Sequence, residues 1–579
     1  MSEQTKMVFG IDLGTTYSAI ATLDSHGNPY IIANDKDQSM LLASAVFFEP
    51  GNPEPIVGIQ AKNQAQLDPE LVIQRVKREI GKETAPTWVI EGVSYDPTKI
   101  SALILKRIKQ YAEEKLHCPV EDVVITCPAY FGIPERMATR QAGELAGFNV
   151  LNVINEPTAA ALSYLVRSLT PQQNSKIMVY DLGGGTFDVT LFEIDAGGGI
   201  SNLNVLYSYG DDHLGGADWD DSLIELLCER YCQAAGIPSI DELKTDLYCY
   251  NDIVTKAEGL KRNLSARISD SIIVSGTKLS VSREEFEEIT RDKVSQTISF
   301  VQHVLEHTAV AAHQVEIVLL VGGSTKMPMI RNALETVFPG EGRVLSEDPD
   351  EAVAKGAVLA AALTYNEIIS ASQIGRAGQS ADTLTSSEVT LANAFDLTTP
   401  AAQTAFLSDA PLISIASGSG VGIAYRDKIQ KSFGPAVISG SDYVVDNLIF
   451  QGQDAPQSIT RTYYTTAPGP YDLDVSVFEN ESADNRVPLI LEEDGSFSCP
   501  QVELKVRSVG ILQMKIPDGA PRESEVELTI HYGEKGLDVS ARLLPDGQQF
   551  AATLLSIGVK TEEEMARDLQ QLKALSTRA

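Results

Sequence analysis

The chain has 579 residues, of which 43% are apolar and 22% charged, and these fractions are typical of globular proteins. At roughly one domain per 150 residues, the length predicts two to four domains. The formal net charge of −33 argues against a nucleic-acid or anionic-membrane partner, because a phosphate-rich surface would be repelled.

Cysteine content and apolar patterning narrow the class further. The six cysteines are too few for a disulfide framework, and the N-terminal residues contain no apolar signal stretch. No apolar run approaches about eighteen residues, so we expect no membrane span. Together these features predict a cytoplasmic protein.

Residues 1–365 alternate between strand-length apolar runs and helical patterns. The strand-length runs are Val8–Ile11, Val123–Cys127, Ile177–Tyr180 and Ile317–Val321. Periodic helical stretches lie between them, including Lys99–Leu116 and Arg283–His307. This alternation predicts an α/β domain with buried central strands.

One strand–turn unit occurs twice in this region. Residues 11–16 read Ile-Asp-Leu-Gly-Thr-Thr, and residues 180–186 read Tyr-Asp-Leu-Gly-Gly-Gly-Thr. A duplicated lobe, with a cleft between the two copies, is the simplest explanation.

The remaining chain divides into three parts. Residues 366–409 are rich in Ala, Ser, Thr and Gln and are predicted to be a flexible interdomain linker with an insertion. Residues 410–557 contain alternating stretches separated by turn residues, which predicts an all-β sandwich. Within residues 558–579, Thr561 and Glu564 form a capping box that opens one short helix, Glu562–Leu575.

The two repeated loops have the composition of a phosphate clamp. Gly14 lets backbone N–H groups approach phosphate oxygens, Thr15 and Thr16 add hydroxyl donors, and Asp12 can hold Mg²⁺ through water. A plain β-turn is the alternative for this loop taken alone. The second loop, Asp181–Asp188, has three consecutive glycines, and it makes phosphate binding from two sides the better interpretation.

Two further elements fit the same cleft. Gly322 and Gly323 end a strand and open a helix, which suits the adenosine and α-phosphate of a nucleotide. Glu156 precedes Pro157 at the start of an alanine-rich helix, where it either favours the helix dipole or positions an attacking water.

Four segments then carry a family resemblance: GIDLGTTYSAIA, VYDLGGGTFDV, INEPTAAALSY and VLLVGGSTKMP. They resemble the 70-kDa heat-shock chaperone family (DnaK type), whose nucleotide fold is shared with actin and sugar kinases. The resemblance covers nearly all of residues 7–365 and is fainter in the β region. It implies a two-lobed, actin-like ATPase domain followed by a β-sandwich that binds unfolded or extended polypeptide segments.

The resemblance also assigns roles residue by residue. It implies a catalytic group made of Lys77, Glu156, Asp181, Thr186 and Asp188, with Asp12 and Asp181 on the Mg²⁺ side. It implies ATP or ADP contacts from Asp12, Gly14, Thr15, Thr16, Gly183, Gly184, Gly185, Gly215, Gly216, Glu258, Lys261, Arg262, Ser265, Gly322, Gly323, Ser324, Lys326 and Asp350. A J-domain cochaperone and a nucleotide-exchange factor are the family's partners.

The chain departs from the family pattern at four points. Lys326 stands where the family usually has Arg beside adenine, and Asn152 stands where many members carry a basic residue for the J-domain. The acidic–leucine linker is matched best by Phe406–Leu412, after an insertion of roughly forty residues. The helical lid after the β domain is reduced to the single predicted helix.

These features predict a molecular chaperone that hydrolyses ATP to control polypeptide binding and release. Two alternatives stay open: an actin-like ATPase whose β domain binds one dedicated protein partner, and a small-molecule kinase. An actin-like filament former is a third. The Glu156–Ala161 element and the β domain argue against both the kinase and the filament former.

Overall fold

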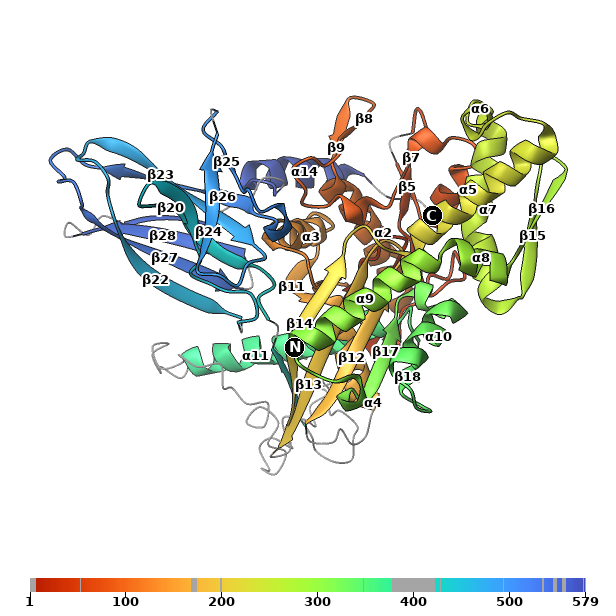
Figure 1. Ribbon diagram of the computed structural model, residues 1–579, viewed down its shortest axis with the longest axis horizontal. Coiled ribbons are helices and arrows are strands. Elements are labelled where there is room, and N and C mark those ends of the chain that lie inside the picture. Colours follow the sequence, from red (N-terminus) through yellow and green to blue (C-terminus); the bar gives the residue numbers. More distant parts are fainter. Residues whose placement is uncertain are drawn as a thin grey trace.

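The structure is a computed structural model that describes residues 7–52, 54–167, 174–197, 200–346, 348–376, 422–426, 428–453, 455–492, 494–533, 536–544, 549–553, 559–575 and 577. Figure 1 shows an α/β region built on two sheets, with a separate β domain packed beside it. No helix within these ranges is long and apolar enough to cross a membrane.

The first sheet belongs to lobe I and has the order β11-β10-β1-β2-β3, with β4 (Leu42–Ala43) also on β2. Its strands are β1 (Val8–Asp12), β2 (Tyr17–Leu23), β3 (Pro29–Ile31), β10 (Asp122–Cys127) and β11 (Asn149–Asn155). β1 pairs with β2 in antiparallel fashion and with β10 in parallel. The turn after Asp12 therefore lies at the carboxyl end of the two parallel strands.

The second sheet repeats this arrangement in lobe II, with the order β18-β17-β12-β13-β14-β19. Its strands are β12 (Ser175–Leu182), β13 (Phe187–Gly197), β14 (Ile200–Asp211), β17 (Ile317–Val321), β18 (Val344–Leu345) and β19 (Gly422–Arg426). β12 pairs with β13 in antiparallel fashion and with β17 in parallel. The predicted two-lobed α/β fold is therefore confirmed.

Helices α4 (Glu156–Arg167) and α11 (Ala352–Arg376) join the lobes through one core, which takes buried residues from both sheets. Their backbones lie very close, because a Cβ on Gly356 would meet the carbonyl oxygen of Ala159 at 1.6 Å. A Cβ on Gly10 of β1 would meet the nitrogen of Val358 at 2.0 Å. The glycines at positions 10 and 356 allow α11 to pack closely against β1 and α4.

Lobe II carries further helices over its sheet: α5 (Gly216–Ala235), α7 (Leu247–Ala266), α8 (Arg283–Ile289) and α9 (Arg291–His307). The predicted continuous helical stretch Arg283–His307 is wrong at one point, because it divides at Thr290. The Thr290 hydroxyl is buried and donates to the carbonyl of Phe286 at 2.8 Å, while its backbone leaves helical geometry. Periodicity alone does not register such a break.

The β domain contains two sheets around one core, as the predicted sandwich requires. The six-stranded sheet contains β20 (Ser432–Ser439), β21 (Asp442–Asp446), β23 (Tyr471–Asn480), β24 (Arg486–Leu491), β25 (Phe497–Ser498) and β26 (Arg507–Ile516). The four-stranded sheet contains β22 (Gln457–Tyr464), β27 (Glu525–Gly533), β28 (Gly536–Leu543) and β29 (Gln549–Thr553). Fully buried side chains such as Val477, Ile530 and Leu537 fill the space between them.

The segments around the β domain lie differently from the sequence expectation. The predicted linker 366–409 begins inside α11, and residues 377–409, with the Phe406–Leu412 match, lie outside the described residues. Strand β19, within the range predicted for the β domain, instead joins lobe II by pairing in parallel with β14.

The C-terminal helix α14 (Glu562–Ala574) has the predicted capping box at Thr561 and Glu564. It packs on helices α2 (Pro97–Leu116) and α3 (Ile133–Leu145) of lobe I, where Leu572 enters the lobe I core. In Figure 1 it lies in the upper part of the α/β region near α3, so it is placed on lobe I and is not laid across the β-sandwich.

Candidate functional site

A cavity of about 690 Å³ lies between the two lobes at the strand ends. It brings together residues from widely separated stretches, among them the β1–β2 turn, the β12–β13 turn, helix α7 and the turn after β17. The predicted site residues that line it are Asp12, Gly14, Thr15, Thr16, Lys77, Glu156, Asp181, Gly183, Gly184, Thr186, Gly216, Glu258, Lys261, Arg262, Ser265, Gly322, Gly323, Ser324, Lys326 and Asp350.

The two glycine-containing loops touch each other across the cleft. A Cβ on Gly184 would lie 2.0 Å from the Thr16 hydroxyl oxygen, and one on Gly185 would lie 2.5 Å from the Thr15 methyl group. Gly185 and Gly215, which do not line the cavity, are themselves in contact, because a Cβ on Gly215 would meet the Gly185 backbone. These glycines therefore permit loop-to-loop packing, a constraint that sequence reasoning had attributed to phosphate approach alone.

Three carboxyl groups converge at the floor of the cleft. Burial and the neighbouring Glu156 raise the pKa of Asp12 to about 7. The same two causes raise the pKa values of Asp181 and Asp188 well above the usual range, with Asp12 and Asp188 adding to the effect at Asp181. The raised pKa values come first from burial and second from the crowding of carboxyl groups.

Lys77 is the buried cation of this cluster, and it forms an ion pair with Glu156. Local structure positions both residues. Lys77 sits in a single 3-10 turn that follows Arg75 in the left-handed conformation (φ 58°), and Glu156 begins α4 with Pro157 next. One ammonium group opposite four carboxyl groups leaves the site short of positive charge.

The donor set fits a hard divalent cation such as Mg²⁺, which prefers carboxylate oxygens and water. Asp188 is 1% exposed, and its Oδ1 atom has no hydrogen-bond partner within the described part of the chain. Its Oδ2 atom accepts from the backbone N–H of Ala129 at 3.3 Å. An orphaned buried carboxylate oxygen is costly, and a metal-bound water would satisfy it.

The opposite wall of the cavity is built from α7 and the turn after β17. Lys261 forms an ion pair with Asp220 at 2.9 Å and donates to the carbonyl of Gly216 at 2.7 Å. Ser324 donates to the carbonyl of Gly183 at 2.9 Å, so the turn is tied to the glycine loop. These contacts hold this wall of the cavity in place, with charged side chains bonded to closely packed backbone.

The turn after β17 depends on its glycines. Gly322 has φ 81°, and a Cβ there would meet the carbonyl oxygen of Leu182 at 2.4 Å. A Cβ on Gly323 would meet Asp350 at 2.8 Å. Lys326, the residue that departs from the family pattern, forms an ion pair with Asp350 at the cavity rim.

Several cavity residues were not predicted from the sequence, and two of them, Tyr17 and Asp220, bind predicted site residues. Tyr17 follows Thr16 directly, lies under the Lys62 ammonium at 4.6 Å and donates its hydroxyl to Glu258 at 3.2 Å. Asp220 stands four residues after the predicted Gly216 and pairs with Lys261. Their proximity to predicted residues in the sequence was the available signal, but only the fold shows which way they face.

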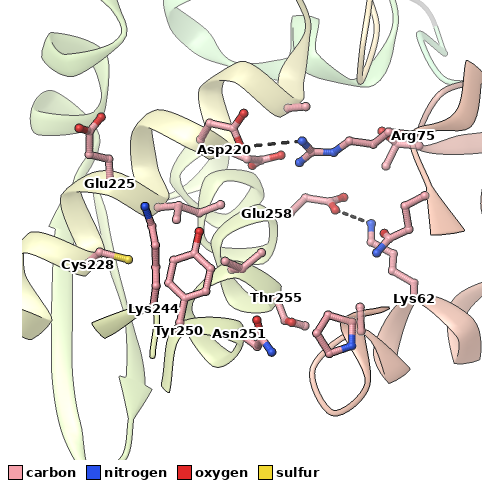
Figure 2. Close-up of a pocket in the computed structure, with 18 of the residues that line it drawn as sticks. Lys62, Arg75, Asp220, Glu225, Cys228, Lys244, Tyr250, Asn251, Thr255 and Glu258 are labelled. Carbon is pink, nitrogen blue, oxygen red and sulfur yellow. Dashed lines mark hydrogen bonds and ion pairs between the residues drawn. The ribbon is translucent and has the colours of Figure 1, made fainter. Parts of the chain in front are cut away.

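A second cavity of about 680 Å³ adjoins the first on its outer side. Figure 2 shows Lys62 and Arg75 projecting from lobe I toward Glu258 and the acidic residues of α5. Ion pairs cross between the lobes here and nearby: Lys62–Glu258, Arg75–Asp221 (3.8 Å), Arg78–Asp218 (2.7 Å) and Lys82–Asp212 (3.5 Å). The closed arrangement of the lobes is thus held by charge pairs along the cleft.

Comparison with known proteins gives a consistent result. Residues 8–369 match the family described as "Hsp70 protein". The chaperone protein DnaK of Thermosipho melanesiensis is 37% identical over 377 residues, which cover 63% of this chain and 61% of that protein. The chaperone protein DnaK of Thermotoga neapolitana is 37% identical over 374 residues, with 63% and 60% covered. The chain therefore matches about three fifths of the length of these relatives.

Proposed function

Because the chain belongs to the Hsp70 family, we propose that it is a molecular chaperone that hydrolyses ATP to control the binding and release of unfolded or extended polypeptide segments. The observation that carries this proposal is the buried cluster of Asp12, Asp181, Asp188 and Glu156 around Lys77, at the floor of a cleft walled by glycine loops.

The glycine loops are proposed to hold the phosphate groups. Thr15 and Thr16 come from lobe I, and Thr186 comes from lobe II, so hydroxyl groups face the cavity from both sides. The backbone N–H groups around Gly14 and Gly183 are the further donors. Asp12 and Asp181 would hold Mg²⁺ through water, and the bound ion would neutralise phosphate charge.

Hydrolysis needs an aligned water and stabilised charge more than covalent chemistry. Lys77 is proposed to contact the γ-phosphate. Its ammonium group must then either bind the phosphate and Glu156 together or break its ion pair with Glu156. Glu156 and Asp188 then orient the attacking water through their carboxylate oxygens. Thr186 lines the cavity from the lobe II loop and is proposed to contribute a hydroxyl hydrogen bond.

The adenosine end is proposed to lie against α7 and the turn after β17. Glu258, Lys261, Arg262 and Ser265 share the inner face of α7. On the other side the proposed contacts are Gly322, Gly323, Ser324, Lys326 and Asp350. The Lys326–Asp350 pair offers a point charge where an arginine would stack flat on the base, which predicts weaker stacking.

The connection from this site to the β domain runs through lobe II. Asp188 pairs with Gly210 of β14 across the sheet, and β14 in turn carries β19, from which the chain enters the β domain. A change in the Gly183–Gly185 loop can therefore bias the outer strand through two strands of one sheet. We propose that ATP favours the docked β domain and that hydrolysis releases it.

J-domain cochaperones and nucleotide-exchange factors remain proposed partners, as they are for the family. Asn152 lies on β11 at the edge of the lobe I sheet, and its side-chain oxygen accepts from the N–H of Val153 at 2.7 Å. The position therefore presents no positive charge to an acidic partner surface, which predicts weak stimulation by a J-domain.

The proposal is tested by ATP turnover of the full chain with and without an extended peptide. We expect the peptide to change the turnover rate, and Lys77→Ala to retain ATP binding while losing hydrolysis. Lys573→Ala, at an exposed position of α14 that does not line the cavity, is the matched control. Unchanged turnover in Lys77→Ala would refute the assigned role, and turnover that ignores every peptide would favour a dedicated partner or the kinase alternative.

A further inference from the structure

Strand β22 forms one edge of the four-stranded sheet. It pairs with β27 over eight continuous residues, from Gln457 to Tyr464, without a bulge. No strand in the described part of the chain pairs with its other side. Figure 1 shows β22 along the outer border of the β domain, away from the α/β region.

The outward-facing backbone groups of β22 can be identified from the hydrogen bonds at its end. Thr465 donates its N–H to the carbonyl of Ser524 and accepts from the N–H of Glu523, both at 3.0 Å. Both of its backbone groups thus face the β27 side. Because backbone direction alternates along an antiparallel strand, the N–H and C=O groups of Ser458, Thr460, Thr462 and Tyr464 face away from the sheet.

Among the described residues this edge lacks the usual protection against pairing. Native edge strands are blunted by lysines, prolines, bulges or covering segments. β22 contains no lysine or proline, and its one charged side chain, Arg461, is turned onto the buried Asp446 at 2.9 Å. Tyr463 donates its hydroxyl to the same carboxylate at 2.8 Å. These two bonds connect β22 to β21 of the other sheet.

The exposed surface beside the edge is acidic. Thr462 and Tyr464 pair with Glu527 and Glu525 of β27 in the register. Tyr464 is 61% exposed. A strand added next to β22 would lie beside the Tyr464 ring and two strand spacings, roughly 10 Å, from β27. Only long basic side chains that reach past Thr462 would approach Glu525 and Glu527, the second of which also pairs with Arg542 at 3.5 Å. This arrangement favours lysine or arginine in the added strand. A second copy of this chain would bring the same glutamates and a charge of −33, so self-pairing is disfavoured.

We infer that the β22 edge is a docking site for an extended polypeptide segment with basic residues at alternate positions, which adds to the sheet as a further strand. The backbone groups of Ser458, Thr460, Thr462 and Tyr464 supply the hydrogen bonds, and alternate side chains set the preference. The inference rests on the proposed function, which requires extended polypeptide clients, and it names where one class of them binds.

The test uses the full chain and a fluorescein-labelled peptide of about ten residues with alternating valine and lysine. Thr462→Pro removes an outward N–H and adds a ring at the edge, while the bonds to β27 remain, since prolines are tolerated at such positions. Thr462→Val is the matched control, because it keeps the N–H. We expect the proline variant to weaken peptide binding about tenfold or more and the valine variant to bind within about twofold.

Amide hydrogen exchange on the unmodified chain gives an independent measurement. The peptide should slow exchange at Thr460, Thr462 and Tyr464 and leave the already paired amides of Ile459 and Tyr463 unchanged. Peptide binding that neither protects these amides nor responds to Thr462→Pro would overturn the edge site and leave the chaperone function standing. Loss of self-association in Thr462→Pro would identify a second copy as the occupant instead. If no peptide binds and turnover is peptide-independent, the proposed function itself fails.

Discussion

Arg507 of the β domain and Glu135 of lobe I form a two-pronged ion pair across the domain boundary, with Nη1–Oε1 and Nη2–Oε2 distances of 2.7 and 3.0 Å. The same guanidinium also binds Glu479 of β23, which is 2% exposed. Ile133, two residues before Glu135, enters the core of the β domain. The docked arrangement of the two domains is thus centred on one arginine and on apolar contacts from α3, made by Ile133 and Met137.

Replacing Arg507 by methionine should release the β domain from lobe I. The change leaves Glu135 and Glu479 buried without their cation, which costs on the order of 3 kcal/mol. Hydrogen exchange should become faster in α3 and β26. Arg522→Met, at an exposed position of the same domain, is the control. Unchanged exchange in α3 in the Arg507 variant would show that the apolar contacts suffice.

Gly184→Ala should abolish most ATP turnover. Its Cβ would lie 2.0 Å from the Thr16 hydroxyl oxygen, so the two loops must separate. A displacement of about 1 Å at such a site can lower the rate on the order of a hundredfold. Gly183→Ala is the comparison, because its Cβ would meet nothing closer than 3.5 Å. Equal losses in the two variants would show that loop packing is not the cause.

The nucleotide-free chain should lose stability as the pH rises through the window between about 4 and 7. Asp12 has a pKa of about 7 in the fold, against the ordinary value of 3.8. The folded state therefore keeps a proton that the unfolded state releases, and the free energy of unfolding falls on the order of 4 kcal/mol across this range. Thermal unfolding against pH, compared with Asp12→Asn, measures this.

Magnesium should reverse the effect in a pH-dependent way. At pH 6 the ion must displace a proton from Asp12, while at pH 8 the carboxylate is already free, so Mg²⁺ should raise the melting temperature more at pH 8. Asp12→Asn should show a small shift at both values. A shift of the same size at both values in the unmodified chain contradicts the assignment of Asp12 to the metal side.

Asp568→Ala should undock helix α14 from lobe I. Its carboxylate, with a side chain 4% exposed, forms ion pairs with Lys99 at 3.2 Å and Lys560 at 2.8 Å. The variant leaves both lysines without this partner, which costs on the order of 3 kcal/mol locally. Proteolysis within residues 559–575 should become faster. Glu563→Ala, on the exposed face of the same helix, should leave the cleavage rate unchanged.

The sequence alone determined the local elements and most members of the candidate site. Strands β1, β10, β12 and β17 were recognisable because buried parallel strands are short, continuous apolar runs. The capping box at Thr561 was readable because a cap is a contact between residues three apart. The two Asp-Leu-Gly loops were recognisable because their composition is unusual for plain turns.

Tertiary structure alone decided which distant groups meet. The packing of Gly184 on Thr16, the placement of β19 beside β14, and the docking of α14 on lobe I each join segments more than a hundred residues apart. No local period or cap encodes such a pairing. Such a pairing forms because apolar faces and buried charges still need partners after the helices and strands have formed. Asp568, which lies between Lys99 and Lys560, is one buried charge that finds its partners in this way.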